Sequence, residues 1–171
     1  MFIPLHDTNP LKKISFPYVT VALIVLNVGI YVVLQTGWFI PLEDENLTAF
    51  AVVPTQFLAS TGGDSSVLAS GGVLVPERLT LVTYMFLHGG WIHLIGNMLF
   101  LWVFGDNIED AMGHMRFIMF YLMCGIFAAL AHTYMLPHSD LPLIGASGAV
   151  AGVISAYLIL HPKVKVWVLA L

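Results

Sequence analysis

Long apolar runs alternate with polar connectors along this chain of 171 residues. A helix that crosses a bilayer needs about 20 predominantly apolar residues, so these runs predict membrane-spanning helices. A fifth apolar run begins near Val164, and the chain stops inside it at Leu171. We therefore expect one membrane domain over residues 1–171, truncated at its C-terminus, with four complete spans and the start of a fifth. The complete spans are expected at residues 17–36, 91–105, 115–136 and 143–160.

The connector between the first two spans, residues 37–90, is long and mixed in character. It holds an acidic cluster at residues 43–45 and a tract rich in glycine and serine at residues 60–72. Glycine and serine in series indicate a loop. The amphipathic, aromatic stretches on either side of that tract are typical of the membrane interface. We expect a structured extramembrane loop that lies on the membrane surface.

The composition favours an all-α, multi-pass membrane bundle. Hydrophobic residues make up 58% of the chain and charged residues only 9%, whereas soluble domains carry roughly 25% charged residues. The net charge of -4 gives no indication of a nucleic-acid partner. The lone cysteine, Cys124, lies in an apolar run and cannot form an internal disulfide. The partner that the composition indicates is the lipid bilayer.

Basic residues set the expected orientation. Lys12 and Lys13 precede the first span, and Lys163 and Lys165 follow the fourth. An even number of spans separates the two pairs, so they fall on the same side of the membrane. The positive-inside rule makes that side cytoplasmic. The N-terminus is then cytoplasmic, and the long connector lies outside.

Three polar side chains on two predicted spans fall at a similar depth. His93 and Asn97 are four residues apart near the outer end of the second span, so they share one helix face. Ser147 is expected about one turn inside the outer end of the fourth span. Polar groups within a membrane indicate a functional site by default. Ser147 can act as a nucleophile if a base removes its proton, and His93 and Asn97 can donate hydrogen bonds to an oxyanion.

Small residues around Ser147 allow two interpretations. Gly145 and Gly148 leave room for a substrate backbone to approach the serine. Gly148, Gly152 and Ala156 recur at intervals of four residues, which is a pattern that membrane helices use for close packing. On this stretch alone, packing is favoured over a nucleophile.

The histidine and the asparagine also admit other roles. His93 and Asn97 can form an interhelical hydrogen-bond pair that only fixes packing. A metal site built from His88, His93 and Asn97 has no carboxylate or third histidine at ligand spacing. The residues therefore disfavour a metal site here.

Two motifs, in order and on the expected spans, make the sequence resemble the rhomboid family of intramembrane serine proteases. "FLHGGWIHLIGNMLFLWVFG" carries the family's H-x-x-x-N as His93 and Asn97, and "GASGAVAGVISAYL" carries its G-x-S-G with Ser147 at the nucleophile position. The resemblance implies a six-helix bundle and a Ser–His dyad that needs no metal or cofactor. It assigns His93 and Asn97 to oxyanion stabilisation. It places the dyad histidine on a sixth helix, beyond residue 171.

The resemblance leads to two hypotheses of function. The first is a serine endopeptidase that cleaves transmembrane segments of membrane proteins, with residues 1–171 inactive alone because they lack the dyad histidine. The alternative is a non-catalytic rhomboid-like protein that binds such segments without cleaving them. The presence of Ser147, His93 and Asn97 together favours the protease. A channel or transporter is disfavoured because the spans carry no charged midplane residue and no inverted repeat. We expect a site that opens to the outer face of a bacterial plasma membrane.

Overall fold

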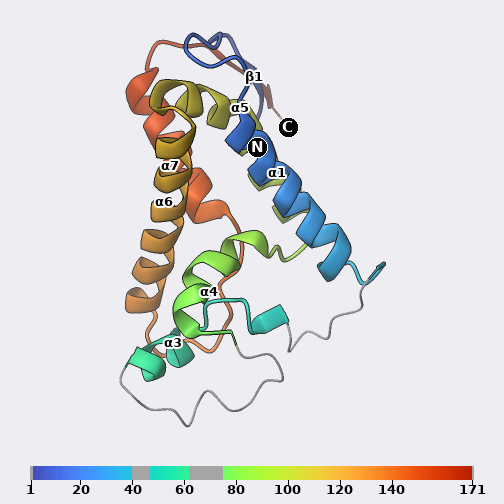
Figure 1. Ribbon diagram of the computed structural model, residues 1–171, viewed down its shortest axis with the longest axis vertical. Coiled ribbons are helices and arrows are strands. Elements are labelled where there is room, and N and C mark those ends of the chain that lie inside the picture. The colour runs from blue at the N-terminus through green and yellow to red at the C-terminus, as the bar shows by residue number, and fades with distance from the viewer. Residues whose placement is uncertain (1, 40–46, 62–74, 171) are drawn as a thin grey trace.

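The computed structural model describes residues 2–39, 47–61 and 75–170, and helices dominate this part of the chain (Figure 1). The acidic cluster at 43–45 and nearly all of the tract at 60–72 lie outside the described residues. The elements are β1 (Phe2–Asp7), α1 (Tyr18–Ile30), the π-helix η1 (Tyr31–Gln35), α3 (Pro54–Thr61), α4 (Glu77–Thr83), the 3₁₀ turn η3 (Tyr84–Phe86), α5 (Trp91–Met112), α6 (His114–Met135), α7 (Ser147–Leu160) and β2 (Val166–Ala170).

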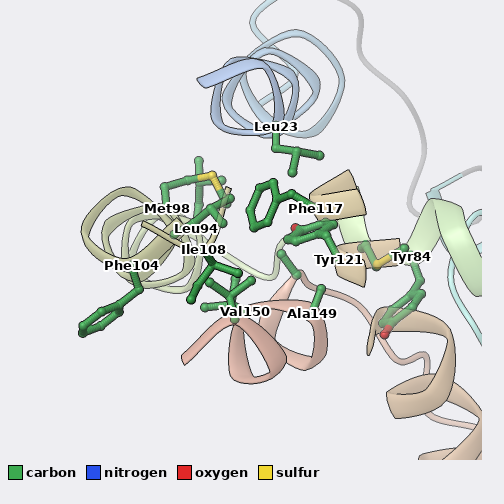
Figure 2. Packing of buried hydrophobic residues seen from close by; sticks show 14 of the residues in the cluster. Leu23, Tyr84, Leu94, Met98, Phe104, Ile108, Phe117, Tyr121, Ala149 and Val150 are labelled. Carbon is green, nitrogen blue, oxygen red and sulfur yellow. The ribbon is translucent and has the colours of Figure 1, made fainter. Parts of the chain in front are cut away.

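A core of apolar side chains lies where the long helices meet. Helix α7 packs against both α5 and α6, and α1 packs along α5. Figure 2 shows Leu23 of α1, Leu94 of α5, Tyr121 of α6 and Val150 of α7 directed toward this shared region. The connector helices α3 and α4 pack against α6, so the described parts of the long connector include helices that contact the bundle.

Helix length and composition support a membrane bundle. Within the described residues, Tyr18–Gln35 and α6 are each long and apolar enough to cross a membrane. The segment Glu77–Phe86 and α5 make a broken pair, bent by 84°, that brings the number of such spans to at most 3. Helix α7 is apolar but has only 14 residues. The bundle is therefore supported, and the count of four complete spans stays a prediction.

Two span boundaries differ from the predicted ones. Helix α5 continues past residue 105 to Met112, because the polar residues near its end have partners in the N-terminal segment. The Asp110 carboxylate accepts hydrogen bonds from the backbone N–H groups of Lys12, Lys13 and Ile14. Helix α7 begins at Ser147 and not near residue 143, so the serine occupies the first helical position.

The predicted start of a fifth helical span is wrong in its secondary structure. Residues Val166–Ala170 form a strand that pairs antiparallel with β1. The antiparallel ladder pairs backbone groups of this segment with those of β1. The pairing brings the N-terminal segment to Lys165, whose carbonyl accepts a hydrogen bond from the Thr8 N–H at 3.2 Å. Both basic pairs thus lie at the same end of the bundle, as predicted.

Glu109 joins three helices at this end of the bundle. Its side chain is fully buried. Its carboxylate accepts hydrogen bonds from the N–H of Val19 at 2.9 Å, and from the N–H and Oγ1 of Thr20 at 2.8 and 2.7 Å. It also bonds His114 Nδ1, at the start of α6. A carboxylate at a helix N-terminus pairs otherwise unsatisfied N–H groups and complements the helix dipole, so Glu109 fixes the start of α1 on α5.

Candidate active site

The turn before Ser147 is held by the long connector. Val52 and Leu143 form an isolated bridge, with N···O distances of 3.2 and 2.8 Å. The Gly145 N–H donates to the carbonyl of Tyr84 at 2.9 Å. These bonds pair the backbone of residues 143 and 145 outside any helix, which explains why α7 begins only at Ser147. The connector therefore sets the position of the serine.

Gly145 lies directly against the imidazole of His93. Its φ is +113°, a conformation that residues with a Cβ rarely adopt. A Cβ at this position would lie 2.6 Å from both Cε1 and Nε2 of His93, and 3.7 Å from Nδ2 of Asn97. Only glycine fits here. The structure thus brings His93 and Asn97 of α5 to the turn that precedes Ser147.

One ring nitrogen of His93 has a defined partner. The ring is half-buried, and Nδ1 lies 3.4 Å from the backbone N–H of Gly89, which donates to it. A nitrogen that accepts a hydrogen bond carries no proton, so the proton of the neutral ring is on Nε2. Nε2 is the nitrogen that faces Gly145. His93 therefore presents a donor to the turn before the serine.

Asn97 carries a second donor at the same place. The residue is buried, with 8% of its surface exposed, and its Nδ2 has no hydrogen-bond partner among the described residues. Buried polar groups are nearly always paired, and an unpaired one costs about 1–3 kcal/mol. A packing role for this amide would use the Nδ2 donor. An unpaired donor beside His93 is instead suited to a group that arrives with a substrate.

Ser147 is exposed on a face of α7 made of small residues. Ser147, Ala151 and Ser155 are all exposed and follow one another at helical spacing. The first turn of α7 has backbone N–H groups with no intrahelical partner, and the helix dipole is positive at this end. The serine hydroxyl is thus open to a second molecule or a further helix, in a field that favours developing negative charge.

The opposite side of α7 shows the predicted close packing. A Cβ at Gly148 would lie 2.3 Å from Cβ of Ala128, and one at Gly152 would lie 2.4 Å from Sγ of Cys124. Both glycines therefore bring α7 close to α6. The space beside Gly148 is filled by α6 and the space beside Gly145 by the ring of His93, so the approach of a substrate backbone at these glycines stays a prediction.

His88 adds a second imidazole next to His93. The two ring centroids are 5.1 Å apart, with an interplanar angle of 67°, and His88 is buried. Within the part of the chain that the structure describes, no group of three or more His, Cys, Asp or Glu side chains is placed to hold a metal ion. The contact that His88 makes at this site is the packing of its ring edge-to-face against the ring of His93.

The family model of the Rhomboid domain matches residues 76–171. The chain belongs to the rhomboid family. The matched stretch includes α4, α5, α6 and α7, so it contains His93, Asn97 and Ser147. Residues 76–171 therefore match a rhomboid domain, the family that the two sequence motifs indicated.

Curated relatives of this rhomboid include plant and bacterial proteins. The chain is 30% identical over 157 residues to "RHOMBOID-like protein 6, mitochondrial" of Arabidopsis thaliana, covering 82% of this chain and 50% of the relative. It is 34% identical to "Putative rhomboid protease YdcA" of Bacillus subtilis, covering 51% of this chain and 43% of the relative. It is 36% identical to "Rhomboid protease GluP" of the same organism, covering 61% and 19%. The chain thus spans half or less of the length of these relatives. No solved structure matches it significantly.

The sequence did not indicate two groups that shape this site. Tyr84 contributes its backbone carbonyl to Gly145, and its hydroxyl donates to the carbonyl of Gly125 at 2.7 Å. The side chain of Gln35 bonds the backbone of His88. A polar residue at the C-terminal end of the first predicted span was the one available signal for Gln35. Every residue has a backbone carbonyl, so the contact that the Tyr84 carbonyl makes cannot be indicated by the sequence.

Proposed function

We propose that this rhomboid is an intramembrane serine endopeptidase that cleaves transmembrane segments of membrane proteins. The observation that carries the proposal is the pair of donors against Gly145. Nε2 of His93 faces this glycine, and the unpartnered Nδ2 of Asn97 lies beside it. Gly145 is two residues before Ser147. A nucleophile with two donors nearby is the arrangement that acyl transfer requires.

The proposed reaction begins when the Ser147 hydroxyl loses its proton to a base and its Oγ bonds the scissile carbonyl carbon. The carbonyl oxygen takes the electron pair as an oxyanion. Nε2–H of His93, Nδ2–H of Asn97 and the N–H of Ser147 donate to it. The C–N bond then breaks, and the base returns its proton to the leaving amine. Water hydrolyses the resulting acyl-enzyme through a second tetrahedral intermediate that uses the same donors.

The base is proposed to be a histidine beyond residue 171. The exposed face of α7 formed by Ser147, Ala151 and Ser155 supports this, because small residues allow a neighbouring helix to approach closely. A helix packed on this face would place a side chain next to the serine hydroxyl. The family resemblance puts the dyad histidine on such a helix.

The proposed substrate reaches the site from the bilayer. A peptide bond in a regular transmembrane helix is shielded by its own hydrogen bonds, so the segment must unwind near its entry into the membrane. We place the protein in a bacterial plasma membrane as a multi-pass protein, with a cytoplasmic N-terminus and a site that opens to the outer face. Support comes from the basic residues at one end of the bundle and from the two relatives of Bacillus subtilis.

A fluorophosphonate probe tests the nucleophile in the protein as its gene encodes it. The wild type is expected to be labelled and Ser147→Ala to be unlabelled. Ser155→Ala is the matched control, because Ser155 is exposed on the same face of α7 and is expected to leave labelling unchanged. Equal labelling of wild type and Ser147→Ala would contradict the proposal. An unlabelled wild type that captures transmembrane segments intact would favour the non-catalytic binder.

A further inference from the structure

One side chain at the outer end of the first span holds the backbone of His88 from both sides. Nε2 of Gln35 donates to the carbonyl oxygen of His88 at 3.0 Å, and the N–H of His88 donates to Oε1 of Gln35 at 2.9 Å. A primary amide offers a donor and an acceptor in one plane. Two bonds to the same residue therefore fix both its position and its orientation.

The residue next to His88 contacts the candidate site. Gly89 donates its N–H to Nδ1 of His93 at 3.4 Å. A Cβ at Gly89 would lie 3.8 Å from the same nitrogen, so the backbone passes close to the ring. The ring of His88 covers His93 on another side. Gly89 follows His88 directly in the chain. Fixing the backbone of His88 therefore holds both groups that contact the ring of His93, which are the Gly89 N–H and the His88 ring.

The local structure of the first span explains how Gln35 reaches this point. Tyr31–Gln35 form a π-helix, in which the N–H of Thr36 donates to the carbonyl of Tyr31 at 3.0 Å. A π-turn adds a residue to the helical turn and redirects the side chains that follow, and such turns occur frequently at functional sites. The ring of Tyr31 also contacts Trp91 with its centroid 4.8 Å away. The π-helix thus contacts Trp91, the first residue of α5, through Tyr31, and it contacts His88, which precedes α5, through Gln35.

We propose that Gln35 is a positioning residue for His93. By holding His88, it keeps the Gly89 N–H on Nδ1, and this keeps the proton of His93 on Nε2, facing the oxyanion. The two side-chain hydrogen bonds of Gln35 go to the backbone of His88, so Gln35 acts on the candidate site through His88. The inference rests on the proposed protease function, since it concerns the alignment of an oxyanion donor. Gln35 lies in neither sequence motif, yet the rate of cleavage is proposed to depend on it.

The first test compares Gln35→Leu with wild type in the full gene product, using a cleavable transmembrane substrate. Loss of both bonds is expected to lower kcat by roughly tenfold to hundredfold and to leave KM within about twofold, because misplaced catalytic groups cost rate rather than binding. Thr36→Val is the matched control. Thr36 bonds the Val32 carbonyl within its own helix, and its loss is expected to leave kcat unchanged.

A second variant separates positioning from simple stabilisation. In Gln35→Glu, a protonated side chain keeps one donor and one acceptor, whereas the ionised form has no donor for the His88 carbonyl. The activity of Gln35→Glu relative to wild type is therefore expected to rise as the pH falls. The ¹⁵N NMR shifts of His93 should report the Nε2–H tautomer in wild type and a mixture in Gln35→Leu.

The outcomes distinguish this inference from the proposed function. Unchanged kcat and an unchanged His93 tautomer in Gln35→Leu, with Ser147→Ala inactive, would overturn the positioning role and leave the protease intact. Cleavage by Ser147→Ala would instead overturn the proposed function, in which Ser147 is the nucleophile. If Gln35→Leu fails to fold, the pH profile of Gln35→Glu decides: a ratio to wild type that does not change with pH overturns the inference.

Discussion

The imidazole of His93 fills the space that a side chain at position 145 would need. Both Cε1 and Nε2 lie 2.6 Å from the Cβ position of Gly145. This contact joins α5 to the turn before α7, so it links the H-x-x-x-N motif to the G-x-S-G motif. The two motifs form one site because a glycine allows the ring to approach.

Gly145→Ala is therefore expected to disrupt the site. The added methyl group meets the His93 ring, and the φ of +113° strains any residue with a Cβ by about 1–3 kcal/mol. We expect a lower melting temperature and cleavage reduced by about a hundredfold or more. Gly29→Ala is the control, since a Cβ there meets nothing within 4 Å. Cleavage by Gly145→Ala at the wild-type rate would contradict the contact.

Asn97→Ala separates catalysis from packing. Removal of one oxyanion donor typically lowers kcat by about 10²–10³-fold, and we expect a loss of this size with little change in KM. The Nδ2 donor has no partner among the described residues, so its loss removes no structural hydrogen bond from that atom. We expect a melting temperature close to that of wild type. A variant that is strongly destabilised, with kcat unchanged once folded, would support the packing role instead.

Gly148→Ala tests the close approach of α7 to α6. The new methyl group would lie 2.3 Å from Cβ of Ala128, and overpacking of this kind costs about 1–3 kcal/mol. Ala128→Gly in the same protein removes the clash, at a cost of about 1 kcal/mol for glycine within a helix. The double variant is expected to be more stable than Gly148→Ala alone. Additive losses in a double-mutant cycle of unfolding free energies would show that the two residues do not meet.

Much of this site could be predicted from the sequence, because spacing and topology carry it. His93 and Asn97 share a helix face by their separation, and the predicted even number of spans between them and Ser147 puts the serine at the same end. The small-residue stripe predicted close packing, which Gly148 and Gly152 show. These features depend on side-chain identity at fixed intervals, and such intervals are visible in a sequence.

Other features depend on backbone groups that every residue has. The Val52–Leu143 bridge delays the start of α7, and the Tyr84 carbonyl holds Gly145. Neither has a residue signature. The pairing of β1 with β2 joins segments from opposite ends of the chain, and an apolar run of five residues fits a strand as well as a helix. These contacts depend on how distant segments meet in the fold, and the sequence pattern does not predict them.

Glu109→Gln tests the junction between α1 and α5. The carboxylate accepts three hydrogen bonds from Val19 and Thr20, and an amide has only one oxygen to accept them. The buried NH₂ group would also face donors, so we expect a loss of about 1–3 kcal/mol or more in unfolding free energy. Asp140→Asn is the control, because Asp140 bonds Thr55 at an exposed site. Equal stability of Glu109→Gln and wild type would contradict the role of this junction.

The proposed function requires Ser147 to cleave membrane-embedded substrates with the help of His93 and Asn97. The most direct measurement reconstitutes the full gene product in liposomes with a protein that has a single transmembrane segment, and follows its cleavage by mass spectrometry. Wild type is expected to make one cut near the outer end of the segment, and Ser147→Ala is expected to make none. An intact substrate with wild type, or the same cut with Ser147→Ala, would contradict it.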